Sequence, residues 1–109
     1  MIIVLGSKGM AGHVIADYLK LKGYPVTTVA RDSADIIADF ENKADVDFVI
    51  KRIKELNGTF VINCVGLLVR DSINRPDRAI ILNAWLPHYL ANSLINTRTR
   101  IVHISTDCV

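Results

Sequence analysis

The sequence has no strong excess of charge and no long hydrophobic run. Its 13 Lys and Arg against 11 Asp and Glu give a net charge of +2, and the basic residues are scattered, which argues against a nucleic-acid partner. The longest apolar stretch, Phe60 to Val69, is interrupted by Asn63 and Gly66 and falls short of the roughly 18 residues that a membrane helix needs. Met1 leads directly into an apolar segment without a charged leader, so we expect a cytoplasmic protein with no membrane partner.

Cysteine is also scarce. Cys64 and Cys108 are the two cysteines, and they do not make a metal-binding pattern. We therefore expect free thiols in a reducing compartment and no metal site.

The length of 109 residues predicts one domain, residues 1–109. Half of the residues are hydrophobic and the mean hydropathy is +0.30, which is high for a chain that buries only about 60–65% of its unfolded surface. This composition indicates strands that are covered on both faces, or a sequence cut from something larger.

The stretch from Met1 to Gly12 joins an apolar run, a glycine-rich turn and the start of a helical pattern. This order is typical of the opening of a nucleotide-binding βαβ unit, here with the spacing GxxGxxG. We expect Gly6 to permit the turn, Gly9 to let backbone approach a pyrophosphate, and Gly12 to let the helix pack close to the sheet. The phosphates would bind N–H groups at the helix N-terminus, beside the loop residues Ser7, Lys8 and Met10.

Strand and helix patterns alternate along the chain. Five apolar or β-branched segments are predicted strands: Ile2–Leu5, Val26–Ala30, Ala34–Phe40, Thr59–Asn63 and Arg100–Ser105. Three amphipathic segments are predicted helices: Met10–Leu21, Asp45–Leu56 and Arg75 to about Ile95. The alternation predicts an α/β fold, a Rossmann-type doubly wound parallel sheet of about five strands in the order 3-2-1-4-5, with helices on both faces.

Local signals define the ends of these helices. Gly23 and Pro25 end the first helix, and Asn57-Gly58 ends the second, for which Asp45 is a plausible N-cap. Pro87 lies inside the third helix and should bend it or mark a local break.

The residues after the second predicted strand bear on ribose recognition. A carboxylate at this position binds the 2′-OH of NAD, whereas an arginine accommodates the 2′-phosphate of NADP. Arg31 comes first, which favours NADP(H), and Asp32 leaves NAD(H) open. A solvated charged turn is the simpler interpretation of the same residues.

Two more strand ends carry candidate cofactor contacts. Asp39 and Phe40 end the third predicted strand and are placed to meet the adenine edge, although an ordinary Asp between strand and loop explains them equally well. Cys64, Val65 and Gly66 follow the fourth strand. Small, uncharged residues there let the backbone run beside the cofactor's ribose, and the alternative is a glycine turn without a ligand.

Further polar residues lie later in the chain. Asn83 is polar on an otherwise apolar helix face, where it either holds backbone near the site or is a satisfied core amide. Ser105, Thr106 and Asp107 leave the fifth strand at the sheet edge where ligands bind in open α/β sheets. A hydroxyl there can bond a reacting carbonyl or alcohol, or equally cap a turn. His103, inside that strand, is expected to be a satisfied core residue.

In this order the motifs resemble those of the extended short-chain dehydrogenase/reductase superfamily, and within it those of the dTDP-4-dehydrorhamnose reductase (RmlD-like) type. The likeness covers the whole sequence. It rests on VLGSKGMAGHVIADYL, Asp39, VINCVG, Asn83-Ala84, Leu90-Ala91 and above all HISTDCV, which is close to the family's STDYVF with Cys108 in the tyrosine position.

The resemblance implies both roles and an activity. The three loop glycines would bind the pyrophosphate, Arg31 would sit at the 2′-phosphate, and Asp39 would lie near adenine. Thr106 would be the catalytic Ser/Thr that orients and polarises the substrate carbonyl. The implied activity is the NAD(P)H-dependent reduction of a nucleotide-activated 4-keto sugar for deoxysugar or polysaccharide synthesis, with the nucleotide sugar as substrate.

In this family a tyrosine that acts as general acid, and a lysine that lowers its pKa, follow further along the chain as YxxxK, and a substrate-binding lobe completes the enzyme. This sequence resembles about the first third of such an enzyme and ends before that pair. We therefore expect a cofactor-binding part that is inactive alone. The apolar edge of the fifth strand predicts a homodimer, an ordered part of something longer, or poor solubility.

Two other functions share these features. A sugar-nucleotide epimerase or dehydratase has the same N-terminal half, and its C-terminal lobe would distinguish it. A non-catalytic nucleotide-binding regulatory module is the other alternative, against which Thr106 indicates a catalytic origin.

Overall fold

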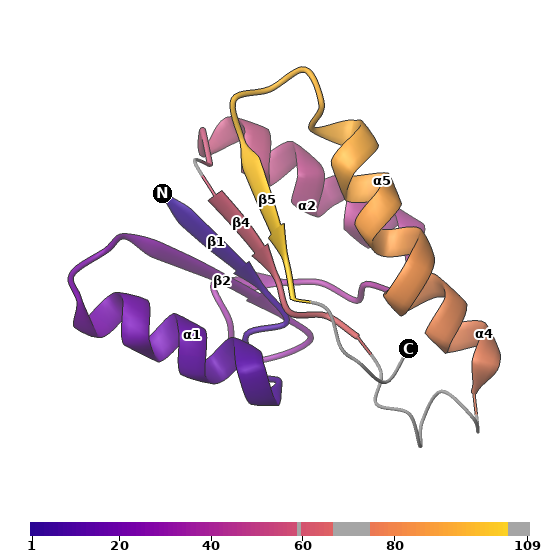
Figure 1. Cartoon of the computed structure of the whole chain (residues 1–109), viewed down its shortest axis with the longest axis horizontal. Helices are drawn as coiled ribbons and strands as arrows, with labels where there is room; N and C mark the ends of the chain where they lie inside the picture. The colour runs from indigo at the N-terminus through magenta and orange to yellow at the C-terminus, as the bar shows by residue number, and fades with distance from the viewer. Residues whose placement is uncertain (59, 67–74, 105–109) are drawn as a thin grey trace.

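The computed structural model describes residues 1–58, 60–66 and 75–104, and these residues form one parallel sheet with helices (Figure 1). The strands are β1 (Ile2–Leu5), β2 (Val26–Ala30), β3 (Ile36–Ile37), β4 (Phe60–Asn63) and β5 (Arg100–His103). The helical elements are α1 (Met10–Leu21), α2 (Lys43–Glu55), α4 (Pro76–Ala79), the π-helical segment η1 (Ile80–Trp85) and α5 (Leu86–Ser93). The strand order β3-β2-β1-β4-β5 is the predicted one.

Helices cover both faces of the sheet, as predicted. Figure 1 shows α1 on one side and α2 with α5 on the other. Side chains of β1 pack against helices on both faces of the sheet, because successive side chains of a strand point to opposite faces. Ile3 and Leu5 belong to the main core cluster, while Val4, equally buried, points to the other face.

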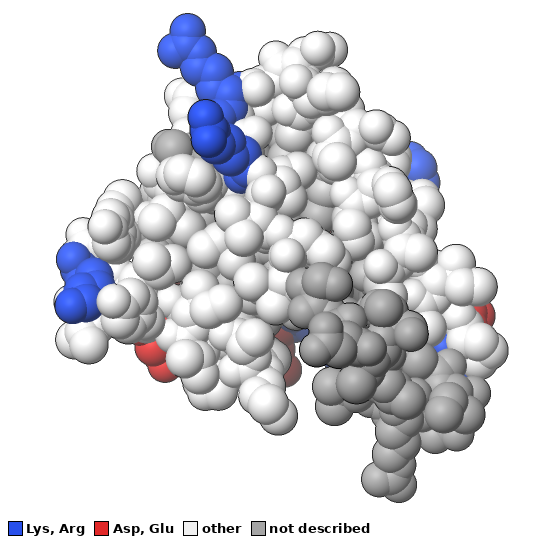
Figure 2. Space-filling view, viewed as in Figure 1, with Lys and Arg blue, Asp and Glu red and all other residues white. Residues whose placement is uncertain are grey.

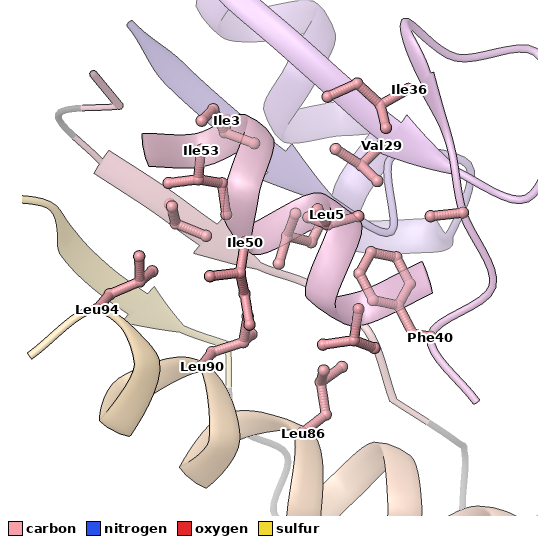
Figure 3. Close-up of a cluster of buried hydrophobic side chains, with 14 of the residues drawn as sticks. Ile3, Leu5, Val29, Ile36, Phe40, Ile50, Ile53, Leu86, Leu90 and Leu94 are labelled. Atoms are coloured by element: carbon pink, nitrogen blue, oxygen red, sulfur yellow. The ribbon is translucent and has the colours of Figure 1, made fainter. Parts of the chain in front are cut away.

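The main core lies between the sheet and the layer of α2, η1 and α5 (Figure 3). Helix α2 buries one apolar stripe and the later helical elements bury another, at the spacing that a helix needs to place side chains on one face. Burial of each such side chain contributes roughly 1.5–3 kcal/mol. The members of the cluster from these helices and the C-cap of α5 are Val46, Val49, Ile50, Ile53, Leu82, Leu86, Leu90 and Leu94.

The structure shortens two predicted strands and corrects one cap. β3 pairs with β2 only through Ile36 and Ile37, since the chain beyond them turns toward α2. The N-cap of α2 is Asn42, whose side chain accepts a hydrogen bond from the Asp45 N–H, so the prediction of Asp45 was wrong. β5 ends at His103.

The predicted helix around Pro87 is divided into three parts. α4 passes into the π-helical turn η1, and Pro87 stands in the first turn of α5. A proline lacks the N–H for the carbonyl four residues earlier, and its ring clashes with that carbonyl in an α-helix. The wider π-helical turn is the local break that Pro87 predicted.

None of the helices in these described ranges combines the length and the apolar character that a membrane span requires.

Helix α1 packs closely against the turn after β1. Gly6 turns the chain with φ of 77°, and a Cβ placed on Gly12 would lie only 2.0 Å from the Gly6 carbonyl oxygen. Both atoms belong to backbone that the sheet and the helix hold, so neither can move aside. Gly12 therefore lets the helix pack close to the sheet, as the sequence predicted.

Replacing Gly12 with alanine tests this contact. We expect the Gly12→Ala chain to lose at least about 3 kcal/mol of its free energy of unfolding, as overpacking against backbone does, measured by urea denaturation. Gly9→Ala is the matched control, because a Cβ there meets only the Gly6 oxygen at an ordinary 3.4 Å. Equal stability of the two variants would contradict the assignment.

Candidate functional site

A cavity of about 340 Å³ opens at the carboxyl ends of the strands. Its walls come from the segments that leave β1, β2, β3 and β4, and from α4 and η1, which close one side. The lining residues are Gly6, Lys8, Gly9, Ala30, Arg31, Asp32, Asp39, Phe40, Glu41, Cys64, Val65, Gly66, Arg78 and Leu82. Most of the residues predicted for a cofactor site thus come together in one place.

The glycine turn forms the floor of this cavity and leads into α1. The Gly6 and Ser7 N–H groups donate to the Val29 carbonyl at 2.9 and 3.3 Å, which ties the turn to the end of β2. Gly9 is the N-cap of α1 with extended backbone, no side chain caps the helix, and its first turn holds no acidic residue. The positive end of the helix dipole is therefore available to an anion.

The turn after β2 presents Arg31 and Asp32, and both side chains are exposed. Asp35 holds this turn: its carboxylate accepts hydrogen bonds from the Thr28 N–H at 2.9 Å and the Thr28 hydroxyl at 3.1 Å. The Asp35 N–H in turn donates to the Thr28 hydroxyl oxygen at 3.0 Å. Ser33, with φ of 47°, completes the reversal. The bond from the Thr28 N–H lowers the pKa of the Asp35 carboxyl.

The wall after β3 is held by carboxylates that bond backbone. Asp39 accepts a hydrogen bond from the Glu41 N–H at 2.9 Å, and its own N–H donates to the Asp45 carboxylate at 2.8 Å. Phe40 lines the cavity but is 6% exposed and belongs to the core cluster, so most of its side chain is packed inside the protein. Asp45, predicted as an N-cap, instead fixes the segment that presents Asp39.

Two charged residues of the cavity were missed by the sequence reasoning. Arg78 on α4 donates to the Glu41 carboxylate at 2.7 Å, and both side chains are about one quarter exposed. The pair joins the wall after β3 to the helical layer across 37 residues of sequence. No local pattern singles out Arg78, because its partner Glu41 lies far away in the sequence. Ala30 and Leu82 were missed as ordinary core residues.

The turn after β4 forms the wall opposite. The Val65 N–H donates to the side-chain oxygen of Asn63 at 3.1 Å. A Cβ on Gly66 would lie 3.0 Å from the Asn83 side-chain oxygen, so Asn83 sits against this turn and not in the cavity lining. Cys64 is a free thiol, and burial raises its pKa. The residues Cys64, Val65 and Gly66 therefore form a wall that is small and uncharged.

Three more predicted residues lie near the cavity without lining it. Ser7 is buried, Met10 is 82% exposed, and Gly12 serves the packing of α1. Thr106 lies outside the described residues, together with Ser105 and Asp107.

His103 is not a core residue, contrary to expectation. It is exposed on the edge strand β5, and its Nδ1 lies 3.2 Å from the Asn63 side-chain nitrogen. Three of the four residues of β5 are exposed, so this strand is less covered by packed side chains than β1.

Tyr18 and Lys22 have the spacing of a YxxxK pair, which the sequence reasoning overlooked. Lys22 Nζ lies 5.6 Å from the centroid of the Tyr18 ring. Both are exposed at the C-terminal end of α1, a helix of 12 residues and hence about 18 Å long. Since the cavity lies at the other end of α1, this pair does not belong to the site.

Charge on the protein is dispersed. Figure 2 shows a mostly uncharged face with separate Lys and Arg side chains. In the cavity, three basic residues (Lys8, Arg31, Arg78) face three acidic ones (Asp32, Asp39, Glu41). The Arg78–Glu41 ion pair balances one charge of each sign, which leaves two cations, Lys8 and Arg31, and two carboxylates, Asp32 and Asp39, on the cavity wall.

A glycine turn, an uncapped helix N-terminus and polar strand ends at the carboxyl edge of a parallel sheet define a Rossmann-type nucleotide-binding unit. The chain belongs to the NAD-dependent epimerase/dehydratase family, whose model matches residues 2–109.

The chain spans about a third of the length of the two dTDP-4-dehydrorhamnose reductases that it matches. It is 34% identical over 109 residues to a dTDP-4-dehydrorhamnose reductase of Mycolicibacterium smegmatis, covering 99% of this chain and 31% of that protein. Solved structures share the fold. A dTDP-4-dehydrorhamnose reductase of Bacillus anthracis in complex with NADP gives a TM-score of 0.78 at 21% identity, over 97% of this chain and 36% of that one. A 3-alpha-hydroxysteroid dehydrogenase of Pseudomonas complexed with NADH gives a TM-score of 0.79 at 18% identity, over 97% of this chain and 47% of that one.

The Asp35 bonds predict an acid-sensitive turn. Because the pKa of this carboxyl is lowered in the folded state, its contribution to stability is present above its unfolded pKa and is lost as pH falls through the folded one. Asp35→Asn should lower the free energy of unfolding at pH 7 by no more than about 1 kcal/mol, since the group is exposed. The gap between wild type and variant should close between about pH 5 and pH 2, measured by urea unfolding. The control is Asp17→Asn on exposed α1, and a gap for Asp35→Asn that does not change with pH would contradict the prediction.

Proposed function

We propose that this chain is the dinucleotide-binding part of a reductase that uses NADP(H) to reduce a nucleotide-activated 4-keto sugar, in the manner of dTDP-4-dehydrorhamnose reductase. The observation that carries the proposal is the cavity at the carboxyl ends of the strands, with a glycine turn and an uncapped helix on one side and Arg31 on the other. The 34% identity to a reductase of that name over 99% of this chain supports the choice within the family.

The residues present fit a dinucleotide. The pyrophosphate would bind at the N-terminus of α1, where Gly9 places no side chain and the helix dipole favours negative charge. The adenine would lie along Asp39 and Phe40. The backbone from Cys64 to Gly66 would run beside the second ribose, since its small side chains leave room.

The position of Arg31 favours NADP(H) over NAD(H). Arg31 directly follows β2 and lines the cavity together with Lys8, and neither has a partner among the described ion pairs. An arginine after the second strand accommodates a 2′-phosphate, whereas a carboxylate binds a 2′-OH. NAD(H) is the alternative if Asp32 makes the ribose contact.

When bound, the nicotinamide supplies or accepts a hydride. Thr106 is our candidate for the hydroxyl that orients and polarises the substrate carbonyl, on the strength of the Ser105-Thr106-Asp107 motif. The general acid and the groups that bind the nucleotide sugar would come from outside these 109 residues, because the relative of known activity is about three times as long. A cytoplasmic setting fits the reduced thiol of Cys64.

A sugar-nucleotide epimerase or dehydratase is the second candidate, and the family model that matches residues 2–109 favours it. A reductase consumes one NADPH for each sugar reduced, whereas an epimerase returns the hydride to its substrate. Net loss of NADPH absorbance on addition of a nucleotide-activated 4-keto sugar to the protein that carries this chain would support the reductase. Sugar conversion without that loss would support the epimerase or dehydratase.

Titration calorimetry with NADPH and NADH tests the cofactor proposal. We expect tighter binding of NADPH, and Arg31→Gln should weaken it by about tenfold or more, the value of a charge-assisted hydrogen bond, with little change for NADH. Asp32→Asn should weaken NADH and leave NADPH nearly unchanged. Arg98→Gln, an exposed residue between α5 and β5, is the control.

Two results would overturn these assignments. Binding of neither dinucleotide would reject the cofactor proposal, and tighter binding of NADH would transfer ribose recognition from Arg31 to Asp32.

A further inference from the structure

Asn63 and His103 form a polar link between the ends of the last two strands. They are register partners in β4 and β5, and the Ile104 N–H donates to the Asn63 carbonyl at 3.0 Å. The Asn63 side chain is fully buried, at 0% exposure, whereas His103 is exposed. A buried amide must satisfy both its donor and its acceptor atoms within the protein.

The hydrogen bonds of Asn63 indicate which atom accepts in its contact with His103. The Val65 N–H can only donate, so the atom that it contacts at 3.1 Å is the Asn63 oxygen. The amide nitrogen then faces His103 Nδ1 at 3.2 Å and donates to it. An imidazole nitrogen accepts only when it carries no proton. The contact as drawn therefore requires an Nδ1 that accepts.

This chain of bonds ends at the cavity. Val65 lines the cavity and is also the neighbour against which the phosphate turn packs, because a Cβ on Gly6 would lie 3.1 Å from Val65 Cγ2. The Asn63 side chain thus sets the position of a turn that borders two parts of the proposed dinucleotide site. His103 keeps the Asn63 amide in the orientation that holds the Val65 N–H.

We propose that His103 is a positioning residue for the dinucleotide, acting through Asn63 and Val65 without touching the ligand, so that protonation of His103 weakens dinucleotide binding. This inference rests on the function proposed above. A protonated ring turns its Nδ1 into a donor that faces the Asn63 donor. If the amide stays in place, its buried nitrogen faces a second donor, which is unfavourable. If it rotates, its oxygen no longer accepts from the Val65 N–H, and the Val65 turn is released.

Other ionisable groups near this end of the sheet do not compete for that contact. Burial raises the pKa of the Cys64 thiol after β4, which keeps it neutral, and Arg100 begins β5 three residues earlier. α5 carries His88, which is exposed. On α4 and at its N-cap, the charged groups are already in ion pairs: Arg75 with Asp77, and Arg78 with Glu41.

The ring tautomer is the first test and needs no ligand. In ¹⁵N spectra of the 109-residue chain at pH 8, His103 should show an unprotonated Nδ1 and a protonated Nε2, and the Val65 amide resonance should move as the ring is protonated. His103→Asn should abolish that movement, because its side-chain oxygen occupies the place of Nδ1 and does not titrate. The opposite tautomer, or a Val65 resonance that ignores the ring, would overturn the proposal.

Dinucleotide affinity is the second test, measured by calorimetry with NADP⁺ and NAD⁺ from pH 8 to pH 5.5. Wild type should weaken on acidification by about tenfold more than His103→Asn, the value of one lost hydrogen bond to a buried group. His103→Leu should bind weakly at every pH, whereas His88→Asn should keep the wild-type slope. The same slope in wild type and His103→Asn would overturn the proposal. Absence of binding in all chains would reject the proposed function, and the spectra would still decide on His103.

Discussion

The close approach of α1 to the turn after β1 is the constraint on which the rest of the structure depends. A Cβ on residue 12 of the helix would lie only 2.0 Å from the Gly6 carbonyl oxygen of the turn, so the contact requires glycine at position 12. Because the helix begins so close to the strand, its N-terminus opens at the carboxyl edge of the sheet. The position of α1 thereby defines where an anion can bind and which strand ends can reach the same ligand.

The second layer gives the site its other walls. α2 and α5 pack on the opposite face through aliphatic side chains that leave little freedom in the sheet (Figure 3). The polar strand ends are then held by hydrogen bonds to backbone: Asp35 to Thr28, Asp45 to Asp39, and Asn63 to Val65. These acceptors lie behind the cavity wall, so groups that never face a ligand determine how the lining residues are presented.

Much of the fold and most of the cavity-lining residues that follow a strand could be predicted from the sequence, because both depend on local patterns. Apolar periodicity distinguishes strands from helices, and glycines mark the turn that a phosphate needs. Residues that directly follow a strand, such as Arg31, Asp39 and Val65, reach the cavity by topology alone. Glu41 and Arg78 could not be foreseen, because their pairing joins positions that are 37 residues apart. The cap of α2 was misassigned since Asn42 and Asp45 are both good acceptors, and only the backbone decides between them.

By itself, the sequence determined the strand order, the glycine turn and the family likeness, since right-handed crossovers and short connections leave few arrangements for alternating strands and helices. The tertiary structure alone decided which polar groups meet. It placed Asn63 at 0% exposure beside an exposed His103, and it put the Tyr18–Lys22 pair at the far end of α1, away from the site, despite its YxxxK spacing. The physical reason is that hydrogen bonds and ion pairs depend on distances of about 3 Å, whereas sequence patterns fix only the face and the end of an element.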